Sequence, residues 1–405
     1  MCARRKAHRP RVRWREKERE ERNHKMEFTV SKADLVRELS LSQGVVEKKT
    51  TIPILSNVLL EARGDRVYLT ATDLELGLRT SCPAKVKKEG SGTIPARKLL
   101  DYVRLLPDAE ITVKFGENNW ANFTCGRSRT RIAGMSRESF PELPAMPETI
   151  AEIPAKQLSA MIARTMFAIS MEESRFTLNG ALLLLGDKTL TMVATDGHRL
   201  AYVQRPSDAS NGHKISYKAL VPRKAMAEIT KLADDAGADA RLRFAGDDNH
   251  LFFEFGPRLL ITRKLTGNFP DYERVLPQDN TNIATLQKDE IKGAIERVAQ
   301  FADERSRAIR VQFTPGEVKV FSSALETGES EESVPGQYSG PELEIGFNAQ
   351  YLLDFLRAIP QNHVSFGLKD QKSAGELQPS SGTEKEGDEK DAGEQYRYVV
   401  MPMRI

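Results

Sequence analysis

The chain has 405 residues, 40% of them hydrophobic and 29% charged, which is the composition of an ordinary soluble globular protein with room for two to four domains. No window of about 18 apolar residues predicts a membrane span, and the charged N-terminus lacks the apolar core of a secretory signal. The three cysteines are too widely spaced for a disulfide framework or a zinc knuckle, so we expect a protein of the reducing cytoplasm.

Residues 1–25 differ from the rest of the chain. They carry eleven Lys or Arg and four Glu, whereas the remainder has 49 basic and 53 acidic residues. Because they hold almost no aliphatic side chains, we predict a disordered extension. One interpretation is a basic arm for nucleic acid; the other, which we favour, is that the protein proper starts at Met26. The body is slightly acidic, so contact with nucleic acid would require its basic side chains to gather on one surface.

From Met26 onward, short strands alternate with amphipathic helices. The first strand is predicted at Glu27–Val30, and Ser31 caps the helix that follows it. Five further helices are predicted from apolar residues at helical spacing, including Leu99, Leu100, Val103 and Leu106; Leu158, Met161 and Ile162; Ile291, Ala294, Ile295 and Val298; and Leu352, Leu353, Phe355, Leu356 and Ile359. Alternating strands close each group, at Ile111–Phe115, Leu251–Phe255 and Tyr398–Met403.

Two short segments of the sequence are repeated at intervals as long as a domain. Thr93–Leu100 returns 127 residues later as Leu220–Met226 and, after another 126, as Gly346–Leu353. Leu69–Leu74 returns after 123 residues as Met192–Gly197. Solenoid repeats run to roughly 20–50 residues, so this period fits whole domains instead. The sequence predicts an α+β fold of three repeated domains, each built from two strand–helix–strands units.

Two Phe-Pro turns, Phe140–Pro144 and Phe269–Tyr272, mark the boundaries between the copies. We therefore predict domains over residues 26–145, 146–270 and 271–405. Residues 373–395 are rich in Ser, Gly, Glu, Asp and Lys without apolar periodicity, and they predict a flexible acidic insertion in the last domain.

Motifs for catalysis are missing from the sequence. We find no Gly-rich phosphate loop, no His/Cys cluster with metal-ligand spacing and no nucleophile motif, so we expect no metal, no cofactor and no enzyme. Asp73 and Asp196 hold equivalent places in two copies, which favours a role in a repeated turn. A hydrolase or nuclease on a repeated scaffold stays open as the competing class.

Basic side chains recur on the predicted helices, but acidic ones share them. Two interpretations remain open: six ordinary solvated helix faces, or six faces that line one surface meeting phosphates. The basic residues concerned are Lys32, Arg37, Arg97, Lys98, Arg104, Lys156, Arg164, Arg223, Lys224, Lys231, Lys288, Lys292, Arg297 and Arg357.

Six sequence runs in the same order give the chain a resemblance to a known family. From Met26 to Ile405 it resembles the bacterial sliding clamp, the beta subunit of DNA polymerase III. The runs are Ile52–Asn57, Gly126–Arg129, Leu178–Gly180, Ala194–Leu200, Phe269–Tyr272 and Tyr398–Ile405.

The resemblance implies a function without catalysis. Two chains would close head to tail into a homodimeric ring with helices inside and sheets outside, and duplex DNA would thread the hole without sequence readout. The ring would tether the replicative polymerase alpha subunit, the clamp-loader delta subunit, other polymerases and repair proteins through short peptides. A clamp-like paralogue with an accessory role in repair or resistance is the alternative within the family.

The resemblance also implies residue roles. Lys49, Arg175 and Phe176 would contact DNA, and Ile132 and Phe301 would meet across the dimer interface. Taken alone, His198 would be interpreted as a structural histidine, and Met401 and Met403 as packing residues of a last strand. The joint occurrence of the sequence runs that contain them favours a peptide groove instead. That groove would consist of Leu178, Thr195, Gly197, His198, Arg199, Leu200, Pro270, Arg274, Val275, Asn348, Tyr351, Val399, Val400, Met401, Pro402, Met403 and Arg404.

Overall fold

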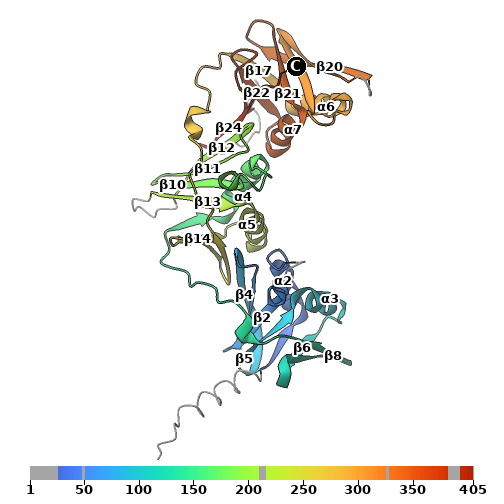
Figure 1. Cartoon of the computed structure of the whole chain (residues 1–405), viewed down its shortest axis with the longest axis vertical. Helices are drawn as coiled ribbons and strands as arrows, with labels where there is room; N and C mark the ends of the chain where they lie inside the picture. Colours follow the sequence, from blue (N-terminus) through green and yellow to red (C-terminus); the bar gives the residue numbers. More distant parts are fainter. Residues whose placement is uncertain (1–25, 48–50, 209–215, 325–327, 382–392, 405) are drawn as a thin grey trace, which may run out of the picture. The chain divides into compact units, whose positions relative to one another are not determined.

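A computed structural model describes residues 26–47, 51–208, 216–324, 328–381 and 393–404 (Figure 1). The predicted basic extension over residues 1–25 lies outside the described residues. Six α-helices and many short antiparallel strands make up the described part of the chain, as the α+β prediction requires. The described residues divide into two compact units: those within 26–149 together with 231–263, and those within 150–230 together with 264–404.

The first unit contains the first copy together with the last strands of the second. Its strands join along the path β8-β7-β6-β1-β4-β16-β15-β14, and β2 bridges β3 and β5. The elements are β1 (Glu27–Ser31), α2 (Lys32–Ser42), η1 (Pro53–Ser56), β2 (Asn57–Arg63), β3 (Arg66–Thr72), β4 (Leu76–Lys88), β5 (Gly90–Pro95), α3 (Ala96–Leu105), β6 (Glu110–Phe115), η2 (Glu117–Asn119), β7 (Trp120–Cys125), β8 (Ser128–Ala133), η3 (Arg137–Ser139), β14 (Arg241–Gly246), β15 (His250–Phe255) and β16 (Arg258–Arg263).

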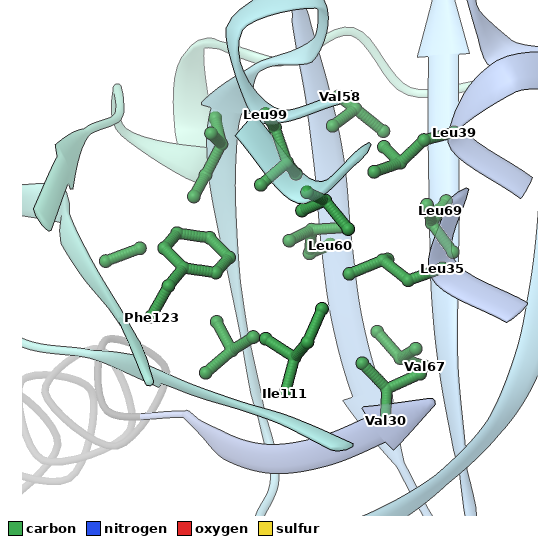
Figure 2. Packing of buried hydrophobic residues seen from close by; sticks show 14 of the residues in the cluster. Val30, Leu35, Leu39, Val58, Leu60, Val67, Leu69, Leu99, Ile111 and Phe123 are labelled. Carbon is green, nitrogen blue, oxygen red and sulfur yellow. The ribbon is translucent and has the colours of Figure 1, made fainter. Parts of the chain in front are cut away.

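The core of the first copy confirms the predicted helix stripes. The Ser31 side chain accepts a hydrogen bond from the Asp34 amide and caps α2, as predicted. From α2, Leu35 and Leu39 turn toward Leu99 of α3 and toward strand residues such as Val58 (Figure 2). All four side chains are almost fully buried, so the periodicity that predicted the helices also identified the face that packs against the sheet.

The second unit contains the front of the second copy and the whole third copy. Its strands form one path, β13-β10-β11-β12-β24-β23-β22-β17-β20-β19-β18-β21, and α5 (Arg223–Ala236) begins here and ends in the first unit. The other elements are β9 (Ala151–Pro154), α4 (Ala155–Thr165), η4 (Met166–Ala168), η5 (Phe176–Leu178), β10 (Gly180–Leu185), β11 (Thr189–Thr195), β12 (Arg199–Pro206), β13 (Tyr217–Pro222), η6 (Tyr272–Arg274), β17 (Asn282–Gln287), α6 (Lys288–Val298), η7 (Ala299–Phe301), β18 (Ala308–Thr314), β19 (Gly316–Ala324), β20 (Gly328–Tyr338), β21 (Leu343–Asn348), α7 (Ala349–Ala358), β22 (His363–Leu368), β23 (Gly375–Ser380) and β24 (Gln395–Val400).

Successive copies are joined by strand pairing of the same kind in both units. In the first unit Leu76 of β4 lies opposite Thr262 of β16. In the second unit Arg199 of β12 lies opposite Val400 of β24. The pairing extends one copy's sheet into the next, so Arg199 on β12 and Val400 on β24 are neighbours although 201 positions separate them in the sequence.

The predicted insertion over residues 373–395 is too wide at both ends. Its first part forms β23, in which Leu377 is fully buried and Glu376 is hydrogen-bonded to Arg397 of β24. Near its other end, the carboxylate of Glu394 pairs with Arg164 and Arg205. The sequence did not reveal that these residues are ordered, because a glutamate that is buried and paired with arginine cannot be told from a solvent-exposed glutamate by composition. Residues 382–392 lie outside the described residues.

Candidate functional site: an apolar groove between the second and third copies

A small cavity in the second unit has an almost entirely apolar wall. It encloses about 120 Å³ beside the β12–β24 pairing. Larger hollows of about 860 and 890 Å³ in the first unit are bordered by mixed Arg, Lys, Glu and Asp side chains, which do not offer one ligand class a consistent surface. The lining of the small cavity is Leu178, Thr195, Gly197, His198, Arg199, Leu200, Pro270, Tyr272, Val275, Val399 and Met401.

The wall of the cavity formed by the second copy is built on a short turn between β11 and β12. Asp196 accepts hydrogen bonds from the amides of His198 and Arg199 at 2.9 and 3.1 Å. Thr195 Oγ1 accepts from the Gly197 amide and donates to the Arg199 carbonyl. Gly197 has a φ of 90°, a conformation that side-chain-bearing residues rarely adopt. The Thr195–Asp196–Gly197 turn places His198 in the cavity lining.

The opposite wall comes from the last strand of the third copy. Val399 is buried in a cluster with Leu200, Phe269 and Leu276, and Tyr272 and Leu178 pack against it. After Val400 the chain leaves the strand, and the Met401 amide donates to the His198 carbonyl at 2.9 Å. The Met401 side chain is 46% exposed. A flexible, polarizable methionine at the mouth of an apolar cavity suits ligands of varied shape.

Arg199 lies beneath the cavity in a buried network of charges and aromatic rings. Nε donates to Asp196 Oδ2 at 3.0 Å, and Nη1 donates to Asp354 Oδ2 at 2.6 Å. Burial alone would lower the pKa of this guanidinium, but Tyr398, Asp354 and Asp196 outweigh burial and raise the pKa above its ordinary value. Arg199 is therefore a permanent cation. Burial also raises the pKa of Tyr272 at the cavity wall to about 12, so this phenol stays neutral.

The structure brings ten of the seventeen predicted groove residues together around the cavity and places seven elsewhere. Asn348 caps α7 through the amides of Gln350 and Tyr351, and the Tyr351 ring lies 4.3 Å from the Arg199 guanidinium carbon. Val400 is fully buried. Arg274 projects from η6 and pairs with Asp271. Pro402, Met403 and Arg404 continue past the cavity, and the Met403 amide bonds to the Gly346 carbonyl.

Tyr272 is a lining residue that the sequence reasoning missed as part of the groove. Its signal was the Phe-Pro-Asp-Tyr turn itself, which we interpreted as a domain exit. In the structure Pro270 and Tyr272 both line the cavity, so the exit turn also forms part of its wall. The Tyr272 ring lies 6.0 Å from the Tyr202 ring.

The predicted DNA and dimer residues are scattered over both units. Lys49 lies outside the described residues. Arg175 donates to the Asp196 carbonyl at 2.8 Å, and the neighbouring Phe176 is 71% exposed. Ile132 on β8 is buried in the first-copy core, and Phe301 in η7 is half-buried. Among the described residues, no cluster of His, Cys, Asp or Glu could hold a metal ion, and no helix is long and apolar enough to cross a membrane.

Comparison with known proteins accounts for the repeats. Residues 26–144, 152–271 and 273–404 match the models of the N-terminal, central and C-terminal domains of the DNA polymerase III beta subunit. The chain is 37% identical over 388 residues to the beta sliding clamp of Caulobacter vibrioides, covering 94% of this chain and 100% of that protein.

Solved structures agree over the same length. The beta subunit of Pseudomonas aeruginosa aligns with a TM-score of 0.86 and 35% identity, covering 94% of this chain and 100% of that one. A second structure from the same organism, with a TM-score of 0.85, 34% identity and the same coverage, holds griselimycin. With all three domain models matched and relatives aligned from end to end, the chain belongs to the family of the DNA polymerase III beta subunit, the bacterial beta sliding clamp.

Proposed function

We propose that this processivity clamp acts as a homodimeric ring around duplex DNA and captures partner proteins through the apolar groove. Membership of the family establishes the role in DNA replication. The observation that carries the proposed groove is the small cavity whose walls come from two successive copies and whose lining is apolar. An extended peptide with one or two large apolar side chains is the ligand that such a cavity accommodates.

The proposed partners are short peptide segments of the polymerase alpha subunit, the clamp-loader delta subunit, other polymerases and repair proteins. A ring of this kind needs no catalytic group, because tethering makes rebinding of the polymerase an intramolecular event. We infer a non-catalytic accessory subunit in the cytoplasm, where the chromosome is copied. Lys49, Arg175 and Phe176 remain proposals for DNA contact, of which the exposed Phe176 is best placed to reach a ligand.

Two strand edges support the proposed dimer. β8 lies at the end of its sheet path, with exposed Arg129 and Arg131. The first half of β20 pairs with β19, while its pairing to β17 among the described strands begins only at Gly336, and Glu329 and Glu331 are exposed there. Edge strands with opposite charges are complementary. Since Ile132 points into the core, the proposed contact uses the β8 backbone and its arginines, with Phe301 beside the start of β20.

The ring is tested by loading the protein onto nicked circular DNA with its clamp loader and then cutting the circle. We expect retention on the circle and release after linearisation, because the link is topological. Retention that survives linearisation would contradict a ring, and metal-dependent cleavage of the DNA would favour the nuclease alternative. Phe301→Asp should shift the sedimentation of the dimer toward the monomer.

The groove is tested separately with griselimycin as the probe, since a related clamp holds it in a solved structure. We expect binding at one site per chain and loss of that binding in Met401→Asp, with dimerisation unchanged. If griselimycin binds equally well to Met401→Asp, the cavity is not the binding site.

A further inference from the structure

Arg199 borders the groove, yet its guanidinium is already engaged by the protein. Nε is bonded to Asp196, Nη1 to Asp354 and, at 3.5 Å, to the Tyr398 hydroxyl, and Nη2 to the Phe167 carbonyl at 2.6 Å. These four contacts leave at most one of the roughly five guanidinium N–H groups for a ligand. The side chain is 10% exposed.

The partners of Arg199 belong to both walls of the groove. Asp196 holds the turn that carries Gly197 and His198, and it is part of the second copy. Asp354 lies on α7 of the third copy, and Tyr398 lies on β24, one residue before Val399. Tyr398 in turn donates to the Tyr351 carbonyl at 2.9 Å and stacks on Phe355. One cation is therefore bonded to both sides of the cavity.

We propose that Arg199 is a positioning residue that sets the spacing of the two groove walls, and that it does not itself recognise the peptide. This inference rests on the proposed function of the cavity as a peptide groove. Breaking a buried ion pair leaves an uncompensated charge, so weakening the link to Asp354 moves the turn and β24 relative to each other. A cavity of about 120 Å³ loses complementarity after a small shift of either wall.

Arg274 provides the contrast. It lies on η6, one residue before the lining residue Val275 but outside the cavity lining, its side chain is 86% exposed, and its ion pair with Asp271 spans only one turn of the chain. An exposed pair of this type is worth little to stability. Arg274→Ala is therefore the matched control, because it removes a neighbouring arginine whose ion pair stays within one turn and does not join the two walls.

The test compares Arg199→Lys, Asp354→Asn, the double variant and Arg274→Ala in the full chain. Lysine keeps the charge but cannot make the planar contacts with Asp196, Asp354 and Phe167. Two readouts are taken: griselimycin affinity, and the NMR signal of the Met401 methyl group in the free protein. Asp354 is outside the cavity lining, so an effect of Asp354→Asn reaches the ligand only through the network.

We expect Arg199→Lys and Asp354→Asn each to lower affinity about tenfold, and the double variant to lose little more than the larger single effect. Both single variants should shift the Met401 methyl signal before any probe is added, and Arg274→Ala should leave it in place. An unchanged Met401 signal, or losses that add in the double variant, would overturn the proposal.

This design distinguishes failure of the proposed groove function from failure of the proposed positioning role of Arg199. If the wild type does not bind griselimycin, the proposed groove function fails, while the Met401 signal still decides whether Arg199 positions the walls. If Arg199→Lys does not fold, Asp354→Asn carries the test alone, and a wild-type affinity and Met401 signal in that variant would overturn the proposal.

Discussion

The first and second copies contain the same turn but put it to different uses. Thr72–Leu76 and Thr195–Arg199 share the same hydrogen bonds: the threonine hydroxyl bonds to the third residue's amide and the fifth residue's carbonyl, and the aspartate accepts from the fourth and fifth amides. This confirms the turn role predicted for Asp73 and Asp196. The backbone design is therefore common, and the differences lie in three side chains.

Two of these differences, at the third and fifth positions, distinguish the turn that lines the cavity from the turn of the first copy. Leu74 stands where the second copy has Gly197, and Leu74 is 50% exposed at a φ of 81°. Leu76, which is buried, stands where the second copy has Arg199. The first turn thus ends in an apolar core residue, whereas the second ends in a cation that reaches the next copy. The comparison teaches that the same turn lies against an apolar core in one copy and forms a cavity wall in the next, depending on what its last residue contacts.

The largest expected effect comes from removing the two aspartates. Asp196→Ala should lower the free energy of unfolding by about 3–5 kcal/mol, because buried Arg199 then lacks one of its carboxylates. Asp73→Ala loses only bonds to backbone amides and should cost about 1–2 kcal/mol. Urea unfolding of both variants measures the difference; equal losses would show that the Arg199 network adds nothing to the turn.

The next largest effect on the free energy of unfolding is expected at the middle residue of each turn. Exchanging glycine and a larger residue there should destabilise the second turn and stabilise the first. Gly197→Ala places a side chain at positive φ, and its Cβ would lie 3.1 Å from Arg175 Nη1, so we expect a loss of about 1–2 kcal/mol. Leu74→Gly removes the same strain but adds unfolded-state freedom, so a gain of about 0.5–1 kcal/mol remains. Thermal unfolding of the pair checks the signs, and destabilisation of Leu74→Gly would mean that the exposed leucine packs more than its accessibility indicates.

The residue that follows the turn also differs between the two copies, and we expect a smaller effect from changing it in the first copy. A Cβ at Gly77 would lie 2.8 Å from a Leu143 methyl group, where the second copy carries Leu200. Leu143 is half-buried and can rotate, so Gly77→Ala should cost about 1 kcal/mol at most. Combining it with Leu143→Ala should restore most of that loss. If the double variant is no better than Gly77→Ala, the strain arises in the backbone of β4.

The smallest expected effect is a pH dependence confined to the first unit. The Arg37 hydrogen bond, opposed by burial and helped by Arg258, holds the pKa of Asp235 below its ordinary value of 3.8. A carboxyl with a lower folded pKa stabilises the protein above the unfolded pKa, and this contribution is lost as pH falls through the folded pKa. Asp235→Asn should therefore lower the urea midpoint at neutral pH and flatten its decline below about pH 4, and Asp234→Asn is the control for removing a neighbouring carboxylate.

The sequence predicted the elements of this fold well because burial leaves a periodic trace. The helix stripes of α2, α3, α6 and α7 and the cap at Ser31 all follow from local spacing. The ten groove residues that lie together came from short runs that the resemblance made recognisable. Tyr272 was missed because we assigned its turn only to the end of a domain, although the same residue also lines the cavity. Strand β23 was missed because its segment is polar, and the burial of Glu376 cannot be seen in the sequence.

By itself the sequence determined the threefold repeat, because similar segments recur at intervals of 123 to 127 residues. It also determined the turn chemistry of Asp73 and Asp196 and the apolar faces of the helices, since these depend on neighbours within a few residues. Only the tertiary structure decided that the Arg199 guanidinium donates hydrogen bonds to Asp354 and to the Phe167 carbonyl. These contacts form where β12 pairs with β24, which places Arg199 opposite Val400, 201 positions away. Long-range pairing of this kind leaves no periodic signal in the sequence, because its energy comes from partners that only the folded chain brings together.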